Sequence, residues 1–250
     1  MKNINWANKA LVPVFVATFS FAAGALGDEK PLRAKAALSY HGTGGNTKTH
    51  GLATAGDAEY TYRKFVFDGS GDYTFAASGG KKAAENTGFF AGTKFFFTGG
   101  DRLYARYRGR WRRNTFAGFE HRLSNFGGLA VYLARSETQE LAVGSLLGYV
   151  HEVFTEAAGK DSVGFPAACV GGDYRLKVND VYELDASLTW DVGLEDIHER
   201  LLTANASFGL VIADWLVMTV TEKVEWDNVT PEGYATHDVT MTVGLAVRNF

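Results

Sequence analysis

Four arginines at alternating positions are the residues of this chain best placed to act together: Arg106, Arg108, Arg110 and Arg112. Side chains two residues apart share one face of a β-strand, so this arginine ladder gathers four positive charges on one face. Such a face favours anions. It must lie against water or other protein, because each arginine facing lipid at the bilayer midplane would cost about 2–4 kcal/mol.

Histidines beside carboxylates are the groups that could perform acid–base catalysis. Three such neighbours occur: Glu120 with His121, His151 with Glu152, and His198 with Glu199. Successive strand residues point to opposite faces, so His151 and Glu152 are poor partners. His41 and His50 flank the turn Gly44-Gly45-Asn46-Thr47, and their spacing matches no metal motif. We expect no catalytic residue, metal or cofactor, and keep a hydrolase at a barrel rim, of the lipid A deacylase or protease type, as an alternative.

Composition excludes several classes of protein. At 46% hydrophobic residues and 21% charged residues, the 250-residue chain is too polar for a multi-span helical membrane protein. Its 14% aromatic residues and net charge of −3 argue against disorder. No basic cluster outside the arginine ladder suggests a phosphate-binding patch, so we expect no nucleic-acid partner. The 29 glycines and 4 prolines suit strands and tight turns.

The first residues have the layout of a secretory signal peptide. Lys2 and Lys9 precede an apolar stretch from Ala10 to Ala23, and small residues follow up to Ala25. This stretch is short against the roughly 20 residues that span a bilayer as a helix. We therefore predict a cleaved signal peptide over residues 1–25 and an exported domain over residues 26–250. The single cysteine, Cys169, leaves that domain without an internal disulfide.

The rest of the chain alternates apolar and polar residues with a period of two, which is typical of β-strands. The segment from Tyr182 to Val192 is one clear case, and the arginine ladder is another. This pattern predicts twelve strands, near 35–44, 48–62, 65–77, 87–97, 102–113, 123–134, 141–154, 162–176, 181–192, 200–212, 215–226 and 239–250. The count could range from ten to fourteen, and Pro166 suggests that the eighth strand begins after it.

The connections between these strands favour a membrane barrel. Even-numbered connections are short, whereas most odd-numbered ones, such as 78–86 and 227–238, are longer and polar. Outer-membrane barrels alternate short periplasmic turns with longer external loops in this way. We therefore predict an all-β fold, a transmembrane antiparallel up-and-down barrel of about twelve strands in the cell outer membrane. A soluble periplasmic β-sandwich or lipocalin-like binding protein is the other alternative.

In a barrel, the arginine ladder should face the lumen. The same alternation turns several acidic residues inward, including Asp68, Asp72 and Asp191. The predicted lumen-lining residues are Arg106, Arg108, Arg110, Arg112, Asp57, Glu59, Glu183 and Asp185. Two interpretations stay open: the charges pair across the lumen and plug it, or they line a narrow water-filled pore whose arginine wall favours anions.

The outer surface and the chain end predict further partners. Aromatic residues near strand ends or on outward faces are candidates for interfacial girdles: Trp111, Trp190, Trp215, Trp226, Tyr104 and Tyr132. The expected surroundings are outer-membrane lipid and lipopolysaccharide. Phe250 ends the last strand, and a terminal phenylalanine is what barrel-assembly machinery typically recognises, although Arg248 occupies a place where an aromatic residue is common.

Three stretches of the sequence resemble a known family. They are Leu38-Ser39-Tyr40 with the Gly45-Asn46-Thr47 turn, Arg102-Leu103-Tyr104-Ala105, and the segment from Trp226-Asp227-Asn228 through Pro231 and Gly233-Tyr234 to Phe250. Together they resemble the YdiY-like, salt-stress-induced outer-membrane proteins, which carry domain of unknown function 481. The resemblance implies an outer-membrane barrel linked to salt or envelope stress, and it supplies no catalytic residues.

Overall fold

Twelve antiparallel strands form a closed barrel in the computed structural model, which describes residues 32–44, 49–78, 81–97, 102–114, 117–197, 199–228, 230 and 236–249. Side chains are described for all of these except 41–44, 49–50, 76–78 and 81–84. The predicted signal peptide, the turn at 45–47, His198 and Phe250 lie outside the described residues, and so do the side chains of His41 and His50.

The strands follow the alternating pattern of the sequence. They are β1 Leu32–Gly44, β2 Thr49–Tyr62, β3 Phe65–Ser78, β4 Lys81–Phe96, β5 Leu103–Asn114, β6 Phe119–Arg135, β7 Gln139–Phe154, β8 Val163–Val178, β9 Tyr182–Gly193, β10 Arg200–Ala213, β11 Leu216–Asp227 and β12 His237–Arg248. The helical element η3 (Glu156–Ala158) is a single turn, and within the described residues no helix has the length and apolar character to span a membrane.

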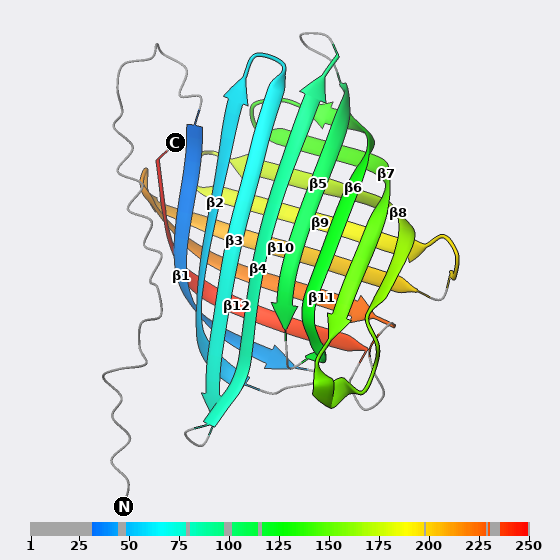
Figure 1. The fold of residues 1–250 in the computed structure, drawn as a ribbon. Coiled ribbons are helices and arrows are strands. Elements are labelled where there is room, and N and C mark those ends of the chain that lie inside the picture. The colour runs from blue at the N-terminus through cyan, green and yellow to red at the C-terminus, as the bar shows by residue number, and fades with distance from the viewer. Residues whose placement is uncertain are drawn as a thin grey trace, which may run out of the picture. The chain divides into compact units, whose positions relative to one another are not determined.

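Each strand pairs with its neighbours in the chain, and β1 pairs with β12 to close the ring. The closing register runs from Lys35 opposite Arg248 to Gly44 opposite Val239. Figure 1 shows the tilted strands of the near wall crossing those of the far wall. The predicted fold class is confirmed, and the sandwich alternative is wrong, because a single sheet closes on itself.

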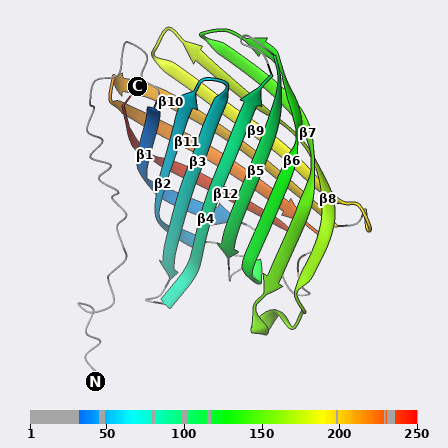
Figure 2. The ribbon, with the colours of Figure 1, turned by 45° about the horizontal axis from the view of Figure 1, so that its top comes forward.

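The two ends of the barrel differ in their connections. At one end, here called the turn end, β1 begins and tight turns join the strands; Figure 2 tips this end forward. Asn179 and Asp180, with φ of 51° and 56°, join β8 to β9, and Val181 donates a backbone hydrogen bond to the Val178 carbonyl. Positive φ at both central residues is the type I′ turn, whose twist matches that of a hairpin. The opposite end, the loop end, carries η3.

Two strands are longer than the alternation predicts. β4 begins at Lys81 rather than near 87, so most of the expected loop over 78–86 is strand, and β6 begins at Phe119 rather than near 123. In both hairpins the ladder continues past the expected boundary, through register shifts after Ala76 and Arg112. A bulge accommodates an irregular segment without ending the pairing, so polar residues there do not mark a loop.

Pro166 lies inside β8, which corrects the expectation that this strand begins after it. Its carbonyl accepts a hydrogen bond from the Leu194 amide, so the backbone polar groups of Pro166 point toward β9. The β8–β9 ladder starts only at Ala167, opposite Gly193. The missing N–H of Pro166 therefore falls where the ladder has ended, and no ladder bond is lost.

The outward face of the barrel is apolar on every strand. Leu52 and Leu147 are more than 60% exposed, and large apolar side chains are similarly exposed all around the ring. Examples from the other ten strands are Leu38, Phe67, Phe89, Tyr107, Leu129, Val170, Leu188, Phe208, Met218 and Leu245. An apolar surface of this extent is far beyond what a soluble monomer exposes, whereas it matches a lipid-facing band.

The inward face is partly packed with apolar side chains. Phe126, Leu146, Val150, Phe165 and Cys169 form one buried cluster on the inner side of β6, β7 and β8. A second buried cluster contains Phe96, Tyr104 and Tyr132 near the turn end, and Phe119 and Phe154 pack at the loop end. We call the inward side chains of β6–β8, with the clusters that they form, the packed sector.

Tyr104 and Tyr132 are therefore not interfacial girdle residues, which corrects the prediction for these two. They are 0% and 5% exposed, and their ring centroids lie 5.1 Å apart. Tyr104 shares the inward parity of the arginine ladder, and the guanidinium of Arg135 covers the Tyr132 ring at 4.8 Å. Trp190 and Trp215, by contrast, are exposed on the outside.

Candidate functional site

The barrel encloses a cavity of roughly 770 Å³ that is lined by side chains from all twelve strands. Its lining runs from Glu59, Lys94 and Lys177 near the turn end to Asn114 and Asp238 near the loop end. The lining contains nine basic and eleven acidic residues. The cavity is therefore polar along its length, in contrast to the apolar outside.

All eight predicted lumen residues lie on the inside of the barrel. Arg106, Arg108 and Arg110 line the large cavity, together with Asp57, Glu59, Glu183 and Asp185. Arg112 is only 4% exposed and lines a much smaller cavity at the loop end. The structure brings seven of these residues into one space and places Arg112 in the smaller cavity, but it does not pair the arginines with the four acidic residues chosen from the sequence.

The arginines of β5 meet partners on distant strands instead. Arg106 Nη1 lies 2.5 Å from Asp173 Oδ2 on β8. Arg112 donates two hydrogen bonds to Glu225 on β11, one of them 2.7 Å long. The same carboxylate lies 3.7 Å from Arg110 Nη2 and 3.2 Å from Lys223 Nζ. The carboxylate of Glu225 thus compensates three cations, Arg110, Arg112 and Lys223.

Arg108 differs from the other three arginines of the ladder in its contacts. Its guanidinium lies 5.7 Å from the ring centroid of Phe90. Among the described residues, it has no carboxylate within ion-pair distance. A cation–π contact leaves the charge of the guanidinium uncompensated. Arg108 is therefore the arginine of the ladder whose charge is most available to a solute.

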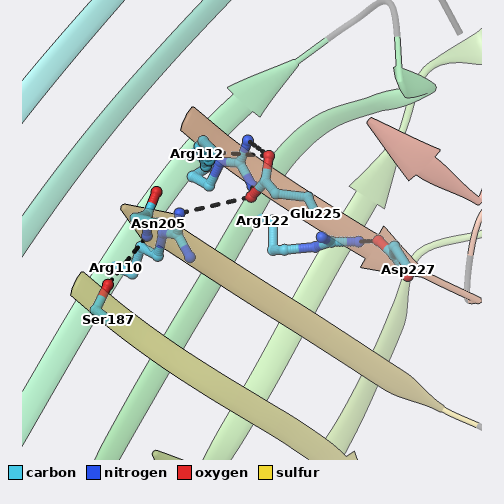
Figure 3. A network of polar contacts seen from close by, with 8 residues as sticks. Arg110, Arg112, Arg122, Ser187, Asn205, Glu225 and Asp227 are labelled. Carbon is cyan, nitrogen blue, oxygen red and sulfur yellow. Dashed lines mark hydrogen bonds and ion pairs between the residues drawn. The ribbon is translucent and has the colours of Figure 1, made fainter. Parts of the chain in front are cut away.

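Ion pairs cross the lumen near the loop end. β5 and β11 are six positions apart in the ring of twelve strands, so Arg112 and Glu225 join opposite walls. Beside them, Arg122 on β6 contacts Asp227 on β11, and its Nε lies 2.5 Å from Glu152 Oε1 on β7. Figure 3 shows Arg112 and Arg122 reaching Glu225 and Asp227. Charges therefore pair across the lumen at this end, and nearer the turn end the pairs Arg106–Asp173 and Arg248–Glu183 join strands three positions apart.

The strands differ in how far they line the cavity. Strands β6, β7 and β8 contribute to the cavity only near the turn end, through Tyr132, Glu140, Ala142 and residues 173–177. Strands β1–β4, β9 and β11 line it over longer stretches, and β10 and β12 line it farther from the turn end. We call their cavity-lining side chains the hollow sector.

Small neutral polar side chains form much of the hollow sector. Ser207 and Thr221 share a hydrogen bond of 2.8 Å, and Asn205 donates one of 3.1 Å to Ser187; Figure 3 shows Asn205 beside Arg110. Further hydroxyl groups of this wall belong to Thr189, Thr203, Thr219, Thr240 and Thr242. Short hydroxyl side chains leave room in the lumen and hydrogen-bond equally well to water or a solute.

His121 and His151, the described histidines of the rim hypothesis, lie apart from the cavity. His121 is exposed and its ring centroid lies 5.9 Å from that of Trp111. His151 is exposed, while Glu152 is buried on the opposite face with Arg122. Glu120 pairs with Arg113 at 2.9 Å. In the loop at 194–199, partial burial, with the nearby charge of Asp196, raises the pKa of Glu199 above its usual range.

No metal site emerges from the part of the chain that the structure describes. Within it, no group of three or more histidine, cysteine, aspartate or glutamate residues is placed to hold a metal ion. The sole cysteine, Cys169, is 2% exposed in the packed sector.

Several functional residues escape the sequence analysis. Lys223 and Glu225 occupy alternate positions of β11 after Thr219 and Thr221, so parity alone could have turned them inward. The sequence also contained a signal for the packed sector. β7 is apolar on both faces over much of its length, as expected for a strand that contacts lipid on one face and protein on the other.

A closed antiparallel barrel with an apolar exterior and a polar lumen defines the class of outer-membrane β-barrels. Within this class, the chain belongs to the DUF481 family, described as proteins of unknown function, whose profile matches residues 36–248. The family resemblance found in the sequence is thereby confirmed. A search of the curated proteins finds no match.

Solved structures share the architecture at very low sequence identity. The NanC porin superposes with a TM-score of 0.57 at 7% identity, covering 85% of this chain and 98% of that one. The translocator domain of the autotransporter NalP from Neisseria meningitidis gives a TM-score of 0.51 at 14% identity, covering 89% and 90%. At these identities the likeness shows the fold alone.

Proposed function

We propose that the protein is an outer-membrane pore for small polar solutes, with an arginine stripe on β5 that favours anionic groups. The observation that carries the proposal is the polar cavity of roughly 770 Å³ that extends between the two ends of the barrel. The apolar exterior supports a location in lipid, with outer-membrane lipid and lipopolysaccharide as the surroundings. The NanC relative is called a porin, which agrees with the proposal.

The preference for anions rests on the local environment of β5. Arg108 holds an uncompensated charge, and Arg110 shares a single carboxylate with two other cations. Both side chains line the cavity. In a narrow space with walls of low dielectric constant, such charges raise the local concentration of ions of opposite sign. The stripe should therefore attract anions to the β5 side of the lumen, so its removal should shift permeation from chloride toward potassium.

Single-channel recording of the refolded protein in a planar bilayer tests the proposal. We expect stable conductance steps and, across a KCl gradient, a reversal potential that gives the ratio of chloride to potassium permeability. Replacing Arg108 and Arg110 together with glutamine should move that potential toward potassium. The control is Arg113→Gln on the outside of β5, which should leave the potential unchanged. A correctly inserted protein without conductance would contradict the pore, and an unchanged potential in the double variant would contradict the role of the stripe.

Three other expectations stay predictions of the sequence. These are export by the signal peptide, assembly through Phe250, and the role in salt or envelope stress that the family resemblance implies. A rim hydrolase gains no support from the described geometry, because Glu120 and Glu152 pair with arginines rather than histidines.

A further inference from the structure

An acidic stripe faces the lumen two and three strands away from the arginine ladder. It consists of Asp57 and Glu59 on β2 with Asp68 and Asp72 on β3, all of which line the cavity. Among the described residues, none of these four carboxylates has a cation within ion-pair distance. The lumen therefore carries negative charge along β2 and β3 and positive charge along β5.

Glycines on the intervening strand β4 leave room for inward side chains between the stripes. Gly92 lies opposite Asp68 on one side and opposite Arg108 on the other. A Cβ atom at Gly92 would lie 2.6 Å from Asp68 Oδ2, so the carboxylate leans over the bare backbone of β4. The Cα atoms of Asp68 and Arg108 are separated by two strand spacings, about 10 Å.

Asp68 and Arg108, on either side of Gly92, carry opposite charges but form no ion pair with each other. The Arg108 guanidinium contacts Phe90, and Asp68 has no ion pair with a described residue. Lys94, two positions along β4, is the other cation near Asp68, and among the described residues no ion pair joins the two. Arg106 is already held by Asp173. The gap over Gly92 thus presents one available carboxylate and one available guanidinium to the lumen.

We propose that this gap is a binding site for small zwitterions, with the ammonium group of the solute on Asp68 and its carboxylate on Arg108. The inference rests on the proposed pore and names its solute class. Both contacts are charge-assisted, which strengthens a hydrogen bond relative to a neutral one. A solute with one charge would satisfy one side and be repelled by the other. Transport needs binding that is weak enough for release, and a partly hydrated gap meets this condition.

Glycine and its uncharged isomer glycolamide form a matched pair of probes, since they have the same formula and differ in charge distribution. Osmotic swelling of proteoliposomes that contain the refolded protein measures the entry of each. We expect glycine to enter about fivefold faster than glycolamide, the ratio that one exposed ion pair can supply. Asp68→Asn and Arg108→Gln should each remove the difference while glycolamide entry continues.

The controls and the contrary outcomes separate this inference from the pore itself. Arg113→Gln and Glu120→Gln remove a charged pair outside the cavity, and both variants should keep the wild-type ratio. Equal entry of the two solutes into wild-type proteoliposomes would overturn the zwitterion site and leave the pore standing. Entry of neither solute would overturn both. A ratio that persists in Asp68→Asn and Arg108→Gln would show that the selectivity lies elsewhere, which also overturns the assignment.

Discussion

The packed sector and the hollow sector face the same lumen and have opposite contents. In the packed sector, Leu146 and Phe165 are less than 10% exposed, and the salt-bridged Arg122 and Glu152 are buried near the loop end. In the hollow sector, short side chains such as Ser207 and Thr242 border open space. A twelve-stranded ring lies between small barrels that side chains fill and large ones that stay open. This barrel combines the two arrangements in different sectors of one wall.

The largest effect is expected from the buried charges of the packed sector. Arg122→Ala leaves Glu152 and Asp227 without their shared partner, and removing one member of a buried ion pair costs about 3–5 kcal/mol. Urea unfolding in lipid vesicles, followed by tryptophan fluorescence, measures the free energy of unfolding. Arg113→Ala is the matched control, because its pair with Glu120 is exposed and worth about 0–1 kcal/mol. Equal losses for both variants would remove the distinction between buried and exposed pairs.

A smaller loss is expected from the apolar cluster of the packed sector. Leu146→Ala removes buried methyl groups from a site that is 3% exposed, which typically costs about 2–5 kcal/mol. The same unfolding assay applies. Leu147→Ala, at the neighbouring 63% exposed position on the outside, is the control and should lose less. If Leu146→Ala cost no more than Leu147→Ala, the packed sector would be loosely filled.

The smallest effect on stability is expected from the hollow sector. Ser207→Ala removes the hydrogen bond to Thr221 in a wall that borders the cavity, so water can replace it and the cost should be about 0.5–1 kcal/mol. Its conductance should equal or slightly exceed that of the wild type, because the lumen becomes no narrower. A loss of stability as large as that of Leu146→Ala would mean that the hollow sector stabilises the fold as much as the packed sector does.

Alternation accounts for how far the sequence analysis reached. A period of two assigns every strand residue to one of two faces, so the inward arginines and the apolar exterior follow from the sequence. Strand boundaries were less accurate, because pairing in β4 and β6 continues through register shifts that polar residues conceal. Tyr104 and Tyr132 were misplaced because an aromatic residue near a strand end suits a membrane interface and an inner cluster equally well.

The ion-pair partners of the inward arginines could not be predicted from the alternation. Arg112 meets Glu225 at a separation of 113 residues, and Arg106 meets Asp173 at a separation of 67. Such pairs depend on strand tilt, on closure and on the reach of each side chain across the ring, none of which is a local property.

The sequence by itself therefore determined the class of fold, a count of about twelve strands and the inward face of the arginine ladder, because the side-chain period of a strand is local. Only the tertiary structure decided that β6–β8 fill their part of the lumen and that Glu225 neutralises one end of the arginine ladder. It also decided that Arg108 and Asp68 stay apart across Gly92. These depend on which walls closure of the barrel brings face to face.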